Sequence, residues 1–192
     1  TVHEESHDDG TAEDQWFPAA SNNWSAVKYS AASDGETLVR FKWFQIGDGG
    51  AMYAKIFTDN NGMPGEELYS TIATGGVDGW NDKDISSDAI SVSGDFWAVI
   101  KTFASTQPIG VDTTTDAGMS MASSNGTDWT AYAGNIMVRI SLDSGSGLDN
   151  EEVSPSTFDI SNAYPNPFNP STTVNINIPN ASLLNISVYN LK

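Results

Sequence analysis

Two histidines near the start of the chain stand at a spacing that could hold zinc. His3-Glu4-Glu5-Ser6-His7 places the histidines four residues apart, so that on a helix both rings bind one metal while the first glutamate activates water. That chemistry requires a helix buried in a domain, a third ligand and a substrate cleft. This segment is instead followed at once by Asp8, Asp9 and Gly10. We therefore predict no catalytic zinc site here.

The rest of the chain lacks the residues of the commonest nucleophilic enzymes. His3 and His7 are the only histidines and there is no cysteine, which removes the usual Ser-His and Cys-His pairs. A glycosidase with paired carboxylates stays open, although the only glutamates between the acidic ends are Glu36, Glu66 and Glu67, all in or beside predicted turns. We predict that the protein is not an enzyme.

One loop concentrates oxygen ligands around Trp80. Its members are Asp78, Asn81, Asp82 and Asp84, and hard cations such as calcium prefer several oxygen ligands close together. The spacing matches no standard calcium loop, so a polar turn held by its own side-chain hydrogen bonds is the alternative. Because a cysteine-free chain has no disulfides to stabilise it, we favour calcium as the cofactor.

Six tryptophans could offer flat faces to sugar rings: Trp16, Trp24, Trp43, Trp80, Trp97 and Trp129. Trp43 and Trp97 lie inside strong strand patterns, so we predict that they are buried. Trp80 and Trp129 lie in polar loops and are the candidates for carbohydrate binding, with core packing as the alternative.

Composition limits both the fold and the partners. With 192 residues, 39% of them hydrophobic, the chain can form one core-sized domain and a smaller piece. The net charge of −17, from 25 acids and 8 bases, argues against nucleic acid and anionic lipid as partners. No apolar run approaches the ~18 residues of a membrane helix, so we predict no membrane span.

The body of the chain reads as all-β, with a turn signal about every ten residues. Phe96 to Phe103 is nearly all apolar, which predicts a central strand covered on both faces. In the last predicted strand Ile136, Val138, Ile140 and Leu142 face inward, while the residues between them face outward. The predicted strands are Ser25 to Ser30, Thr37 to Ile46, Met52 to Thr58, Glu67 to Ala73, Ala89 to Val92, Phe96 to Phe103 and Asn135 to Leu142.

These patterns divide the chain into four segments. Residues 1–15 read as an acidic flexible tail, because they contain six acids and few apolar residues. Residues 16–142 form the predicted body, a jelly-roll-like antiparallel β-sandwich. Residues 143–156 are an acidic Gly/Ser linker. Residues 157–192 are expected to form a partial Ig-like β domain.

The C-terminal segment has the clearest pattern. Three prolines, at 165, 167 and 170, impose an extended lead-in. Two strands with one apolar face each follow, and these faces would be exposed on an isolated hairpin. We therefore expect the strands to pack on the body or to add to a neighbouring subunit's sheet, with continuation of the chain past Lys192 as the alternative. The predicted assembly residues are Val174, Ile176, Ile178, Leu184, Ile186 and Val188.

This segment also resembles a known sorting domain. The Tyr164-Pro165-Asn166-Pro167-Phe168-Asn169-Pro170 entry, the Ser171-Thr172-Thr173 step and the strand Ile186 to Leu191 are similar to the opening of the C-terminal sorting domain of Bacteroidota type IX secretion passengers. The later strands of that domain are missing here. The resemblance implies export through the secretion machinery and an extracellular or cell-surface location.

The body resembles, more loosely, noncatalytic β-sandwich modules of secreted Bacteroidota proteins. The shared features are the turn at Asp59 to Glu66, the Ser93-Gly94-Asp95-Phe96 strand entry and a late tryptophan, Trp129. Attached glycans are a separate question. Residues that match short glycosylation signatures are Asn23, Asn125, Asn180, Asn185 and Thr113, and a chain this rich in Asn, Ser and Thr contains about as many such asparagine triplets by chance.

We therefore expect a secreted, noncatalytic structural or assembly subunit of the cell exterior, such as a surface layer or an extracellular filament. Its expected partners are further copies of itself or neighbouring surface proteins. The alternative is a carbohydrate-binding accessory module of a larger secreted hydrolase, which should be monomeric and show an aromatic-lined groove.

Overall fold

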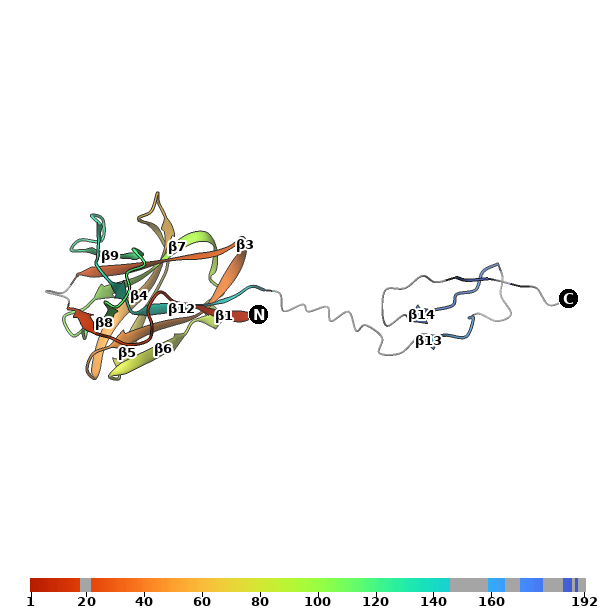
Figure 1. The fold of residues 1–192 in the computed structure, drawn as a ribbon, viewed down its shortest axis with the longest axis horizontal. Coiled ribbons are helices and arrows are strands. Elements are labelled where there is room, and N and C mark those ends of the chain that lie inside the picture. The colour runs from red at the N-terminus through yellow and green to blue at the C-terminus, as the bar shows by residue number, and fades with distance from the viewer. Residues whose placement is uncertain (18–21, 146–158, 165–169, 178–184, 188, 190–192) are drawn as a thin grey trace. The chain divides into compact units, whose positions relative to one another are not determined.

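The computed structural model describes residues 1–17, 22–145, 159–164, 170–177, 185–187 and 189 (Figure 1). The chain forms two compact units, Thr1–Gly147 and Leu148–Lys192. Their boundary falls inside the predicted linker. Within the described residues the only helical element is a short 3-10 turn, η1 (Ser86–Asp88), and the remaining elements are strands. The predicted all-β fold, an antiparallel sandwich, is confirmed.

The first unit contains twelve strands that hydrogen bond into one continuous antiparallel sheet. The strands are β1 (Val2–Glu5), β2 (Asp14–Trp16), β3 (Trp24–Gln45), β4 (Gly49–Asp59), β5 (Pro64–Gly76), β6 (Gly79–Asp84), β7 (Ser91–Thr102), β8 (Ile109–Asp112), β9 (Ser120–Ser123), β10 (Thr130–Ala131), β11 (Asn135–Ile136) and β12 (Val138–Asp143).

β3 is long enough to belong to both halves of the sandwich. Its first part pairs with β7 and β9, and its second part pairs with β12 and β6. The register between β3 and β7 shifts between Ala31 and Glu36, and the pairing with β6 begins at Arg40. Val27 from the first part and Phe41 from the second are buried in the same apolar cluster. The sheet therefore folds over, and the two parts of β3 face each other across one core.

β7 is buried on both faces, as its apolar sequence predicts. Phe96, Ala98 and Ile100 point into the main core. Trp97 and Val99, which alternate with them, join a second cluster under Met121 and Trp129. The burial of Trp97 and of Trp43 is thus confirmed. The sequence pattern predicts two strands here, Ala89 to Val92 and Phe96 to Phe103. The structure has the single strand β7 instead.

Two strands within the first seventeen residues belong to the sheet, which corrects the prediction of a flexible acidic tail. β1 pairs with β12 and β2 pairs with β8. The acids have basic partners: Glu4 lies 2.7 Å from Lys42, and Asp8 lies 2.5 Å from Arg139. Because the basic residues come from distant strands, the local composition of the segment could not reveal them.

The last strand of the first unit departs from simple alternation. Met137, predicted to face outward, is fully buried and donates its backbone N–H to Gly110. It lies between β11 and β12, which pair with different strands. Ser141, on the strand position that pairs with Glu4 of β1, is buried as well. The expected inward residues Ile136, Val138, Ile140 and Leu142 are all buried.

The second unit contains two short strands, β13 (Asp159–Ile160) and β14 (Ile176–Asn177), which pair antiparallel. Tyr164 and Thr173 form an isolated bridge beside them. Of the predicted assembly residues, Val174 and Ile186 are exposed and Ile176 is half-buried. Ile178, Leu184 and Val188 lie outside the described residues. Across the described part of the chain no helix has the length and apolar character to cross a membrane.

Candidate functional site

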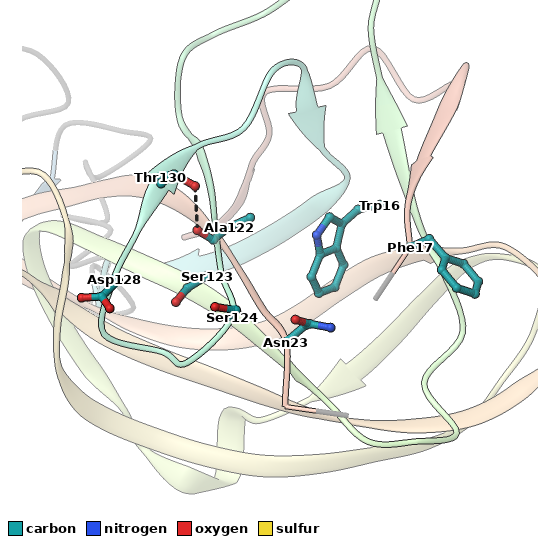
Figure 2. Close-up of a pocket in the computed structure, with 8 residues that line it drawn as sticks. All are labelled: Trp16, Phe17, Asn23, Ala122, Ser123, Ser124, Asp128 and Thr130. Atoms are coloured by element: carbon teal, nitrogen blue, oxygen red, sulfur yellow. Dashed lines mark hydrogen bonds between the residues drawn. The ribbon is translucent and has the colours of Figure 1, made fainter. Parts of the chain in front are cut away.

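An open pocket of about 430 Å³ lies between the end of β2 and the segment that joins β9 to β10 (Figure 2). In Figure 2 Trp16 and Phe17 stand on one side, and Ser123, Ser124 and Asp128 on the other. The pocket therefore combines an aromatic wall with a polar wall. Its lining residues are Trp16, Phe17, Asn23, Ala122, Ser123, Ser124, Asp128 and Thr130.

The two aromatic residues of the pocket differ in exposure because Trp16 ends a strand. Trp16 pairs with Ile109 on β8 and keeps only 6% of its surface exposed as part of the main core. Phe17 follows directly and is 66% exposed. A large exposed aromatic ring costs free energy in water unless a ligand or partner covers it. Burial of Trp16 therefore fixes the end of β2 against the core, and Phe17 is the aromatic residue that is accessible to solvent.

The polar wall is held in place by a network within residues 123–128. The Ser123 hydroxyl accepts hydrogen bonds from the backbone N–H groups of Asn125 and Gly126. The Asn125 side-chain oxygen accepts from Thr127 and Asp128, and its amide donates to the Asp128 carboxylate at 2.7 Å. Such Asx-type bonds fix a turn without regular secondary structure.

Gly126 secures this turn to the sheet. Its φ of +80° lies in the left-handed region, and a Cβ atom there would lie 2.7 Å from the Trp24 ring. Only glycine lets the turn pack directly on Trp24. The pocket wall thus rests on a rigid aromatic base.

The chemistry of the pocket suits a polar ligand with a flat apolar face. Ser124, Asn23 and Asp128, which carry hydroxyl, amide and carboxylate groups, line one part of it, and the aromatic residues Trp16 and Phe17 line another. Sugars present this combination, because their axial C–H groups stack on aromatic rings while their hydroxyls donate and accept hydrogen bonds.

The two tryptophans predicted for carbohydrate binding lie elsewhere. Trp80, on β6, has the guanidinium of Arg139 4.3 Å from its ring centre and meets Phe44 edge-on. Its ring therefore already has a cation partner. Trp129 is partly buried against the second apolar cluster. Neither residue lines the pocket between β2 and residues 123–128.

The four oxygen ligands predicted for calcium do not converge. Asp78 accepts the backbone N–H of Gly47. The Asn81 side chain closes its own turn through Val77. Asp82 and Asp84, two residues apart on β6, both lie beside Arg40. Each group thus has a protein partner, as expected for a polar turn and a paired strand.

A different group of carboxylates lies close together. One oxygen each of Asp9, Glu13 and Asp112 falls within 4.8 Å of the others, an arrangement that could hold a hard cation such as calcium. Asp9 and Glu13 are exposed, whereas Asp112 is buried. No local sequence pattern indicates this group, because about a hundred residues separate Asp9 and Glu13 from Asp112.

Asp112 is held by an unusual number of donors. It accepts the backbone N–H and the hydroxyl of Thr114, the side-chain amide of Asn135 and the backbone N–H of Asp9. Burial by itself raises the pKa of a carboxyl, but these hydrogen bonds outweigh it and hold the pKa of Asp112 well below its usual range. The group is therefore ionised at neutral pH.

Neither histidine lies on the helix that zinc binding at this spacing requires, since His3 is on a strand and His7 is in a bend that follows it. His3 belongs to β1 and lies 3.5 Å from Glu5 and 3.6 Å from Glu36. His7 stacks on Tyr29, with ring centres 4.9 Å apart, and its Nε2 lies 2.7 Å from the carbonyl of Lys28. Among the described residues the cluster that could hold a metal includes neither histidine.

The predicted glycosylation residues occupy varied positions. Asn23 lines the pocket and is partly buried. Asn125 is exposed, although its side chain holds the turn described above. Thr113 and Asn185 are exposed. Asn180 lies outside the described residues.

Comparison with known proteins gives a fold relationship. No protein-family model and no curated protein matches the chain. Among solved structures it is similar to the cysteine protease and lectin-like domains of Cwp84, a surface layer associated protein of Clostridium difficile, with a TM-score of 0.52 and 14% sequence identity. The match covers 64% of this chain but only 32% of that one, so this chain spans about a third of its length. At this identity the likeness shows the fold alone.

Proposed function

We propose that this protein is a noncatalytic β-sandwich module of the cell exterior that binds carbohydrate in the pocket between β2 and residues 123–128. The observation that carries the proposal is the aromatic side of the pocket, formed by buried Trp16 and exposed Phe17, across from the fixed polar turn (Figure 2). Aromatic stacking beside prearranged hydrogen-bonding groups is the usual composition of a sugar site.

Two further features support an exterior location. The solved structure with the similar fold comes from a surface layer associated protein that has a lectin-like domain. The segment from Tyr164 to Pro170 resembles the start of a secretion sorting domain. Export by a type IX-like route would bring the module into contact with surface glycans, and the secretion machinery would be its transient partner.

The proposal of a noncatalytic role follows from the residues around the pocket. Among the described residues that line it, Asp128 is the only one with a carboxylate, and neither histidine is included. Acid-base hydrolysis of a glycosidic bond normally needs two carboxyl groups on opposite sides of that bond. A single carboxylate suits hydroxyl recognition.

A glycan-array screen followed by calorimetry tests this function. The purified chain is applied to bacterial and plant cell-wall oligosaccharides, and each hit is titrated against Phe17→Ala and Asp128→Ala. We expect each variant to weaken binding at least tenfold, since each loses a ring contact or a charge-assisted hydrogen bond. Tyr164→Ala, which removes an exposed ring from the second unit, is the matched control. Full binding by Phe17→Ala would contradict the pocket assignment.

A structural role as an assembly subunit is the second candidate. It is favoured by the apolar residues that the second unit exposes, with Ile186 64% exposed. Strands with bare apolar residues tend to add to another sheet. We expect the double variant Ile176→Asp, Ile186→Asp to abolish assembly and to leave the melting of the first unit nearly unchanged. A double variant that assembles normally would remove this segment from the interface.

A further inference from the structure

One edge of the main sheet is long and uncharged. In the described part of the chain β5 pairs with β4 alone, so alternate N–H and C=O groups along it point away from the sheet. No charged residue occurs from Leu68 to Val77. Ile72, in the middle of this stretch, is 48% exposed.

Other edges carry the charges that normally prevent strand addition. Three of the four residues of β1 are His3, Glu4 and Glu5. β6 ends in Asp82-Lys83-Asp84. Charged edge residues make pairing with another chain unfavourable, because the incoming strand would bury or confront them. β5 lacks this protection between Tyr69 and Thr74, where its register with β4 is regular.

The negative charge of the whole protein limits which part of its surface can contact a second copy. Two copies, each with a net charge of −17, repel each other over most of their surfaces. The uncharged part of β5 is where two copies can approach closely. At its start, Glu67 is paired with Lys55 at 2.7 Å, which reduces repulsion there.

We infer that β5 is a self-association edge, at which β5 of a second copy adds antiparallel with Ile72 near the two-fold axis. In this register Ile72 faces its own counterpart, and Ser70 faces Thr74 of the second copy. The backbone groups of both edges become paired, and two half-exposed isoleucines cover each other. The result is a closed dimer with one sheet continuous through both copies. This inference does not depend on carbohydrate binding.

Sedimentation velocity on the full chain tests whether the protein dimerises through β5. We expect a concentration-dependent dimer whose fraction rises with sodium chloride, since salt screens the repulsion between the acidic copies. Ile72→Lys should raise the dimer dissociation constant more than tenfold. Val2→Lys is the matched control, because Val2 is similarly exposed but lies on β1, and it should leave the dimer unchanged. Unaltered melting curves verify that both variants are folded.

Cysteine cross-linking locates the contact directly, because the chain has no cysteine of its own. Mild oxidation of Ile72→Cys should give a disulfide-linked dimer, whereas Val77→Cys should stay monomeric under denaturing conditions. Two results would overturn the inference. One is a wild-type protein that is monomeric at every concentration and salt level. The other is a dimer that survives Ile72→Lys and fails to cross-link through Ile72→Cys.

Discussion

The carboxylate of Asp8 lies 2.5 Å from Nη2 of Arg139, although 131 residues separate the two in the sequence. The Asp8 side chain is only 1% exposed, and Arg139 also contacts Glu4 at 3.1 Å. This network connects the N-terminal segment to β12, the last strand of the sandwich. The acidic start of the chain is therefore a structural part of the domain.

Replacing Asp8 tests how much this connection contributes to stability. Asp8→Ala leaves Arg139 without its main partner, and removing one member of a largely buried ion pair is strongly unfavourable. We expect a loss of about 2 kcal/mol in the free energy of unfolding, measured by urea denaturation. The exposed carboxylate Asp34 provides the control, and Asp34→Ala should change stability by less than about 0.5 kcal/mol.

Deleting residues 1–14 should have a larger effect than any single substitution. The deletion removes β1 and the first residue of β2, uncovers β12, and leaves Arg139 without its carboxylate partners Glu4 and Asp8. We expect the truncated protein to lose its cooperative thermal transition in calorimetry. A truncated chain that melts like the full chain would show that the segment rests on the sheet without supporting it.

The strands that bury their own apolar residues are the part of the fold that sequence predicts well. Phe96 to Phe103 indicates a central strand, and Trp43 and Trp97 are buried as expected. The N-terminal strands are different, because Val2 is exposed and their stability depends on partners in β12 and β8. Long-range pairing of this kind has no local signature. For the same reason the sequence suggested a solvated tail.

Acid should destabilise the protein through Asp112. Its folded-state pKa is depressed by hydrogen bonds, so the stabilisation is complete above the unfolded-state pKa of about 3.9, declines as the pH falls below that value, and is gone only below the depressed folded-state pKa. Asp112→Asn should cost about 2 kcal/mol at pH 7 and less at pH 3, where the wild-type carboxyl has lost part of its advantage. Urea unfolding at the two pH values measures the difference. An equal cost at both would contradict this role of the charge.

Calcium binding can be assigned to one of two carboxylate groups by thermal melting. We predict that calcium raises the melting temperature and EDTA lowers it, with Asp9 and Glu13 as exposed ligands beside Asp112. Asp9→Asn should remove the response. Asp82→Asn should retain it, because Asp82 is paired with Arg40. The opposite pattern would restore the loop around Trp80 as the calcium site, and a melting temperature that ignores both reagents would exclude calcium from either group.

The candidate pocket could be predicted only in part. The sequence predicts an aromatic residue at a sugar site but proposes Trp80 and Trp129 for it. The exposed aromatic residue at the pocket is instead Phe17, which follows the buried Trp16. Trp80 lies in a polar sequence and looks available, yet Arg139 from β12 contacts its face. Contacts from strands far apart in the sequence determine which aromatic ring stays exposed. A local sequence pattern therefore cannot predict it.

Nuclear magnetic resonance tests the carbohydrate proposal most directly, because each of the six tryptophans gives its own indole N–H signal. A glycan identified on the array is titrated into labelled protein, and the signals are assigned with single tryptophan variants. We predict that the Trp16 indole and the backbone signals of Ser123 and Ser124 shift together, while the Trp80 indole stays unchanged. A shift of Trp80 with Trp16 unchanged would place the ligand on β6 and contradict the pocket.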